Sequence, residues 1–158
     1  MRQKILMTLI SAWLATTMMV DFVAIPIVFR TLNDVMLAGS VGMKLFGIYN
    51  KIEWMLGLGF LLAALPFWKL AWRQRSFAIA SLILFILINV YAFYITPSII
   101  ALTHSMREAL SGDVSVIAAM SQRHQFFHTL YVRLDGFKIL LLVYSLVFMF
   151  RYKKQGTL

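Results

Sequence analysis

Four long apolar stretches, separated by short polar and charged segments, run through the chain. They cover about residues 5–29, 46–68, 77–100 and 128–152. Each stretch is long enough to cross the ~30 Å hydrocarbon core of a bilayer as an α-helix, which takes about 20 residues. A membrane barrel would instead show strands of about ten residues with alternating polarity. The pattern therefore predicts an all-α membrane protein with four transmembrane helices in an up-down bundle.

Two further segments predict short interfacial helices on the outer side of the bundle. Residues 35–46 place apolar side chains at roughly helical spacing among polar ones, and residues 114–120 follow a polar connection. Pro97 is expected to kink or end the third helix. Gly57 and Gly59 are either contact points for a neighbouring helix or sites of simple flexibility. The whole chain is expected to form one domain.

Composition supports a membrane protein and narrows the classes of partner. The hydrophobic fraction is 61%, well above the ~45–50% of soluble domains. The formal charge of +9 does not indicate a nucleic-acid partner, because the basic residues punctuate the apolar runs instead of clustering on a soluble face. The first apolar run is longer than the roughly 7–15 residues of a signal peptide. The lipid bilayer is the expected partner, and the first run is expected to be an uncleaved span.

The charges also predict how the bundle is oriented. An excess of Lys and Arg in short loops marks the cytoplasmic side of a membrane protein. We therefore expect a multi-pass protein of a bacterial-type inner membrane with both termini in the cytoplasm. All six acidic residues and all three histidines fall on the other side or in the outer half of a span. The basic residues at the predicted cytoplasmic ends are Arg2, Lys4, Lys69, Arg73, Arg75, Arg151, Lys153 and Lys154.

Ionisable residues inside the spans form the first candidate site. At a rise of ~1.5 Å per residue, Asp21 lies roughly 12 Å below the outer end of the first span, and Glu53 and Asp135 reach similar depths. Charges at this depth usually face a bundle interior or a water-filled cavity and mark a functional site. The alternative is a structural ion-pair network between helices. The predicted binding residues for a ligand, ion or proton are Asp21, Arg30, Glu53, Arg133, Asp135 and Lys138.

Histidines near the last span form a second candidate site. His124 and His128 are four residues apart and share a helix face, a spacing that lets two imidazoles reach one metal ion or the edge of a cofactor. His104 and Glu108 have the same spacing. The set could hold Zn, Cu, Ni or non-haem Fe, and haem is a second option. Alternatively, these histidines cap helices or bind lipid headgroups.

The functional hypotheses follow from these two sites. The sequence has no Walker loop, GxSxG elbow, HExxH motif or dinucleotide-binding glycine pattern, so catalysis by those routes is not expected and a non-enzymatic role is favoured. The favoured hypothesis is an outward-facing polar pocket that binds a small ligand or metal ion for transport or handling. Four helices make a narrow pathway, so transport would require a homo-oligomer. The alternatives are a non-catalytic subunit or assembly factor of a larger membrane complex, and a haem or quinone redox protein.

Two stretches resemble a known family. They are AIPIVFRTL at residues 24–32 and AGSVGMKLFGIY at residues 38–49. This pattern is similar to that of the transmembrane protein 205-like family, which contains small four-helix membrane proteins of largely unknown function. RHQFFHTLYVRLDGFK at residues 123–138 is similar to the family's segment ahead of the last helix, although residues 132–135 depart from its Ser/Asn pattern. The resemblance implies a four-helix fold and no particular activity. The matching positions are Phe29, Arg30, Thr31, Leu32, Leu45, Phe46 and Tyr49, with His128 in the later segment.

Overall fold

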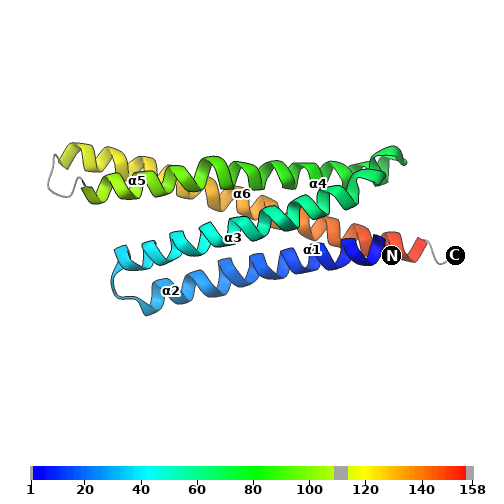
Figure 1. The fold of residues 1–158 in the computed structure, drawn as a ribbon, viewed down its shortest axis with the longest axis horizontal. Helices are drawn as coiled ribbons and strands as arrows, with labels where there is room; N and C mark the ends of the chain where they lie inside the picture. The colour runs from blue at the N-terminus through cyan, green and yellow to red at the C-terminus, as the bar shows by residue number, and fades with distance from the viewer. Residues whose placement is uncertain (1, 109–113, 156–158) are drawn as a thin grey trace.

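The computed structural model describes residues 2–108 and 114–155, and these residues are almost entirely helical (Figure 1). A π-helix interrupts each of two long helical segments, and a 3₁₀ turn ends another. The elements in chain order are α1 (Arg2–Met19), η1 (Val20–Ala24), α2 (Ile25–Thr31), α3 (Val35–Ala64), η2 (Leu65–Lys69), α4 (Trp72–Val90), η3 (Tyr91–Ile95), α5 (Thr96–Glu108) and α6 (Val114–Gln155).

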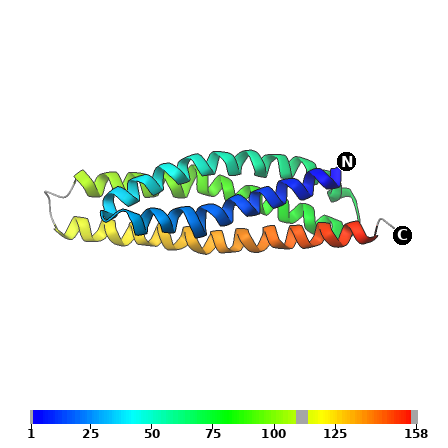
Figure 2. The same ribbon diagram turned by 90° about the horizontal axis from the view of Figure 1, so that it is seen from below.

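The long helical segments lie lengthwise beside one another (Figures 1 and 2). Helix α1 packs on α3 and α6, α3 packs on α4, and both α4 and α5 pack on α6. The N-terminus and the end of α6 lie at the same end of the molecule. The middle of the molecule is therefore a place where side chains from several helices meet.

Three segments of the described chain are long and apolar enough to cross a membrane. They are Gln3–Thr31, Leu37–Lys69 and Trp72–Met106. This composition is that of a multi-pass membrane protein. Helix α6 is long, but its charge-free apolar stretch, residues 139–150, covers only twelve positions between Lys138 and Arg151. The fourth span therefore stays a prediction.

The structure does not separate the two expected interfacial helices from the helices that follow them. Residues 35–46 are the first turns of α3, whose start is fixed when the Leu37 N–H donates to Asp34 Oδ1 at 3.2 Å. Residues 114–120 are likewise the first turns of α6. Both segments continue without a break because they pack on a neighbour: α2 lies on α3, and α5 lies on α6. The expectation of separate interfacial helices was wrong.

Both prolines inside the long helical segments directly follow a π turn. The Ile25 N–H donates to the Val20 carbonyl just before Pro26, and the Thr96 N–H donates to the Tyr91 carbonyl just before Pro97. A proline ring clashes with the carbonyl four residues earlier in a regular α-helix, and the wider π turn makes room for it. The helical segment therefore continues past Pro97 instead of ending there.

The apolar core includes a close contact between helices at Gly57. A Cβ atom at this position would lie 2.3 Å from Ile88 Cδ1 on α4 and 3.1 Å from the Trp13 ring on α1. Gly57 is thus a helix contact point, as one of the two sequence interpretations proposed. At Gly59 a Cβ would make only ordinary contact with Leu9, at 3.8 Å.

Candidate functional site

Lys138 is the centre of a buried group of charged residues. Its Nζ lies 2.7 Å from Glu53 Oε1 and 2.5 Å from Asp135 Oδ1. Lys138 and Glu53 are fully buried, and Asp135 is 6% exposed. Asp135 and Lys138 are three residues apart on α6, so they share a helix face, whereas Glu53 comes from the middle of α3. With Asp21, described next, these residues are called the Lys138 cluster.

Asp21 brings a third carboxyl group to the cluster from the π-helix η1. It is half-buried, and its carboxyl group lies close enough to Asp135, Glu53 and Lys138 to interact with their charges. Two neighbouring carboxyl groups can form a hydrogen bond with each other only when one of them carries a proton. Asp21 Oδ2 is also buried without a hydrogen-bond partner among the described residues. The arrangement therefore suits a proton shared between Asp21 and Asp135.

Aromatic side chains from three elements enclose the cluster. Trp13 on α1 donates from Nε1 to Glu53 Oε1 at 2.8 Å, the same oxygen that Lys138 contacts. The Lys138 ammonium lies 5.6 Å from the ring centre of Tyr49 and 5.5 Å from that of Tyr91, within the range of cation–π attraction. Tyr49 in turn shares a 2.6 Å hydrogen bond with the buried hydroxyl of Thr17.

The charge balance of the cluster determines what it can do. Three carboxyl groups face one ammonium group, so full ionisation would leave two uncompensated negative charges in a low-dielectric interior, which is costly. A bound proton or another cation removes that excess. Several polar atoms facing this region also lack a hydrogen-bond partner among the described residues, which often indicates a missing water or ion. They are Glu53 Oε2, Tyr91 OH, Tyr131 OH and Asp21 Oδ2.

The two predicted arginines lie outside the cluster. Arg133 is only two residues from Asp135, yet it is exposed because positions two apart on a helix point to different sides. Arg30 is exposed near the end of α2. The structure therefore brings together Asp21, Glu53 and the α6 pair, and leaves both arginines on the surface.

The predicted metal site is only partly described. His124 is half-buried and His128 is exposed on the same helix, while His104 is exposed on α5. Burial lowers the pKa of the His124 imidazole, and the nearby His128 lowers that pKa further. The side chain of Glu108 lies outside the described residues. No three His, Asp or Glu side chains in the described part of the chain are placed to hold a metal ion, so metal or haem binding stays a prediction.

Sequence reasoning placed the charged residues at one depth but did not identify most of the aromatic side chains that surround them. Tyr131 precedes Lys138 by seven residues on α6, and Tyr49 precedes Glu53 by four on α3. These spacings put each tyrosine on the same helix face as a cluster residue. Periodicity relative to the charged positions could therefore have found both tyrosines. Trp13 carried no comparable signal, because its partner Glu53 lies forty residues away.

Comparison with known proteins identifies a family without giving it a function. No curated protein and no solved structure matches the chain. A family of unknown function matches residues 8–108, which contain Asp21 and Glu53. Asp135 and Lys138 lie beyond this segment, on α6. The chain belongs to the family described as a domain of unknown function, DUF4149, whose match covers α2, α3, α4 and α5 and most of α1.

Proposed function

We propose that the protein is an integral membrane protein that takes up and releases a proton at the Lys138 cluster. The observation that carries the proposal is the meeting of three carboxyl groups with one buried ammonium group, in which Asp21 lies beside Asp135. The proton would be shared by those two carboxyl groups. The excess negative charge also suits a small cation, and the proton is preferred because it needs no more room than the carboxyl oxygens already provide.

Electrostatics explains why a proton could move on and off this site. Lys138 is held by Glu53 and Asp135, so Asp21 is the carboxyl group with the least compensation. It is also less buried than the other three residues of the cluster. A shift of Lys138 toward or away from Asp135 would change how strongly Asp135 competes for the shared proton. We therefore propose that Asp21 exchanges the proton and that the position of Lys138 controls this exchange.

The same proposal includes the membrane topology. We expect α6 to form a fourth span, since pairing between Asp135, Lys138 and Glu53 offsets much of the cost of placing charges at that depth. We also propose an up-down bundle with both termini in the cytoplasm of a bacterial-type cell, because the basic residues gather at the end of the bundle that carries the termini. The resemblance to the transmembrane protein 205-like family, at residues 24–32, 38–49 and 123–138, belongs to this proposal as well.

Infrared difference spectroscopy of the protein in lipid tests the shared proton. Titration across neutral and acidic pH should reveal the carbonyl stretch of a protonated carboxyl group. Asp21→Asn and Asp135→Asn should each remove or shift that band. Asp34→Asn changes an exposed acidic residue outside the cluster and should leave the band in place. A spectrum without a protonated carboxyl band, or a band that both cluster variants leave unchanged, would refute the proposal.

Proton movement is tested separately in liposomes that contain a pH-sensitive dye. Under an imposed potential, wild-type protein should acidify or alkalinise the lumen faster than liposomes containing the Asp21→Asn variant. An infrared band without any flux would limit the site to proton binding. This result would leave transport of protons unsupported.

A structural role is the second candidate. Lys138 is fully buried with two close carboxylate partners, and the cluster, together with the Trp13 hydrogen bond to Glu53, joins α1, α3 and α6. Such a network can fix how helices align, as a non-catalytic subunit or assembly factor would require. Under this alternative, cluster variants would reduce stability and co-purification of a larger membrane complex while the infrared band remained absent.

A further inference from the structure

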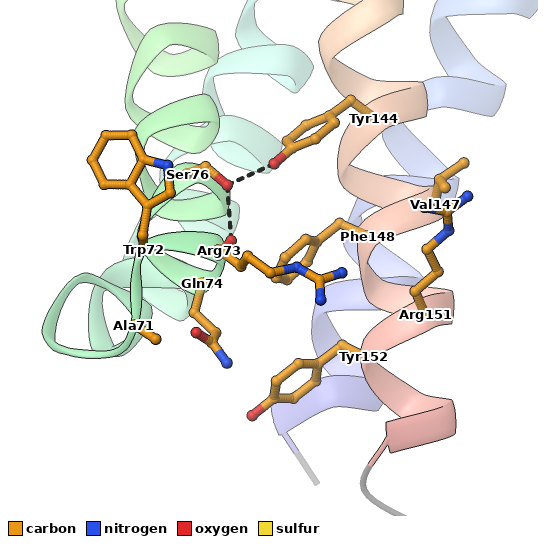
Figure 3. Close-up of a pocket in the computed structure, with 10 residues that line it drawn as sticks. All are labelled: Ala71, Trp72, Arg73, Gln74, Ser76, Tyr144, Val147, Phe148, Arg151 and Tyr152. Atoms are coloured by element: carbon orange, nitrogen blue, oxygen red, sulfur yellow. Dashed lines mark hydrogen bonds between the residues drawn. The ribbon is translucent and has the colours of Figure 1, made fainter.

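A second site lies at the end of the bundle that carries the N-terminus. A cavity of about 510 Å³ opens between the first turn of α4 and the last turns of α6 (Figure 3). Arg151 lies thirteen residues after Lys138 on one helix, a separation of about 20 Å at ~1.5 Å per residue. The cavity is therefore distinct from the Lys138 cluster and does not depend on the function proposed for it.

Two arginines from different helices give the cavity its charge. Arg73 comes from α4 and Arg151 from α6, and no acidic residue in the described chain lines the space. Figure 3 shows the Arg73 side chain reaching across the gap toward α6. Each guanidinium group offers five N–H donors in a fork that fits phosphate oxygens, which makes arginine a preferred residue for phosphate recognition. The cavity is thus suited to an anion with several acceptor oxygens.

Polar contacts hold the two walls of the cavity together. Ser76 Oγ and the Tyr144 hydroxyl share a 2.8 Å hydrogen bond that joins α4 to α6, and Ser76 Oγ also donates to the Arg73 carbonyl at 2.8 Å. Gln74 lines the same space, and its Oε1 is buried without a hydrogen-bond partner in the described chain. A glutamine amide offers both a donor and an acceptor, so this side chain, turned toward the cavity, would suit a hydroxyl group on a ligand whose phosphate contacts the arginines.

Aromatic residues place this cavity at the level of lipid headgroups. Trp72 and Tyr152 line it, and Trp72 is 72% exposed. Trp and Tyr beside basic residues at the end of an apolar run are typical of the interface between membrane and water. The cavity also borders the first turn of α4, where Ala71 provides no side-chain cap for the backbone amides. The positive end of the helix dipole therefore adds to the attraction for an anion.

We propose that this cavity binds a glycerol phosphate group, with Arg73 and Arg151 contacting the phosphate and Gln74 accepting a hydrogen bond from a glycerol hydroxyl. Such a group is found in the headgroup of phosphatidylglycerol and also in free glycerol phosphate. Both share an anionic phosphate ester next to hydroxyl groups. The interfacial position makes the lipid-borne form the expected source.

Binding is measured on the full-length protein in detergent micelles with three probes: short-chain phosphatidylglycerol, short-chain phosphatidylcholine and free glycerol phosphate. The test variant is Arg73→Gln with Arg151→Gln. Its charge-matched control is Lys69→Gln with Arg75→Gln, because both control residues are exposed, lie near the same end and do not line the cavity. General attraction between basic residues and anionic lipid raises the affinity about fivefold per residue. Both variants should lose this contribution to the affinity.

The expected result is a dissociation constant for phosphatidylglycerol that rises at least about tenfold more in the test variant than in the control. Binding of free glycerol phosphate with the same dependence would support the site and assign a soluble source. Equal losses in the two variants would overturn the proposal, as would equal binding of phosphatidylcholine or no measurable binding of either anionic probe.

A second variant keeps the test valid if the glutamine variant fails to fold. Arg73→Lys with Arg151→Lys preserves both charges and removes the planar forks. It should bind phosphatidylglycerol several-fold more weakly than the wild type. Unchanged affinity would overturn recognition of the phosphate by the arginine forks.

Discussion

Replacing Lys138 with methionine is the most informative perturbation of the cluster. Methionine fills a similar volume without the charge, so the change removes two ion pairs, at 2.7 Å to Glu53 and 2.5 Å to Asp135, and leaves little cavity. Glu53 then keeps the 2.8 Å hydrogen bond from Trp13 as its one described donor. The variant thus leaves buried carboxylates without their cation.

The structure sets the expected size of the effect. Removing one partner of a buried ion pair costs about 3–5 kcal/mol because the remaining charge stays buried. Glu53→Gln should cost less, about 1–3 kcal/mol, since Lys138 still contacts Asp135 and Trp13 can still donate to the amide oxygen. In the double variant neither member of the Lys138–Glu53 pair remains. Its cost should therefore fall short of the sum by about 1–3 kcal/mol.

Reversible unfolding in mixed detergent micelles measures these three free energies. Arg133→Met is the matched control, because it removes a positive charge from the same helix at an exposed position. Its effect should stay within about 0.5 kcal/mol. The reasoning would fail if Lys138→Met cost no more than Arg133→Met, or if the single costs simply added in the double variant.

Three further predictions concern packing, titration and hydrogen bonding. Gly57→Val should lower the free energy of unfolding by about 1–3 kcal/mol through overpacking. Gly47→Ala, where a Cβ would meet no atom within 4 Å, should be neutral or stabilising. Equal melting temperatures for these two variants would contradict this prediction. His128→Asn should raise the pKa of His124 only partly toward 6.5, because burial is the larger cause of its lowering, and NMR titration of the imidazole checks this. Since the folded protein binds a proton to His124 less readily than the unfolded chain does, stability should fall as pH drops below about 6.5, and His124→Asn should flatten that dependence. Tyr49→Phe, which removes the 2.6 Å hydrogen bond shared with the buried Thr17 hydroxyl, should lower the free energy of unfolding by about 1 kcal/mol, as measured by thermal unfolding.

The convergence of charged residues could be predicted from sequence because it depends mainly on depth. Counting residues from the span ends placed Asp21, Glu53 and Asp135 in one layer, and the structure brings them together around Lys138. Which side of a helix faces the partner is a separate question. Arg133 lies at the same depth as Asp135 but is exposed, and depth alone could not distinguish them.

Helix continuity was harder to predict because local and tertiary effects oppose each other. Polar residues at 35–46 favour an interfacial segment when read locally, yet packing on α2 keeps them in one helix with the rest of α3. Tyr91 and Tyr94 show a related difficulty. On a regular helix residues three apart share a face, but across η3 Tyr91 is fully buried while Tyr94 is 60% exposed.

The two π turns also restrict which insertions and deletions this fold can accept. Each turn holds one residue more than an α-helix would, so deleting one residue from η3 would restore regular winding. Everything after the deletion would keep nearly the same rotation relative to α4, but the Pro97 ring would then clash with the carbonyl four residues earlier, as it does in a regular α-helix. A deletion within α4 would instead rotate everything after it by about 100°, so Thr96 would lose its 2.9 Å hydrogen bond from Asn50 and α5 would present a different face to α6. The length of α4 is therefore constrained by rotation, and the length of η3 is constrained by the proline that follows it.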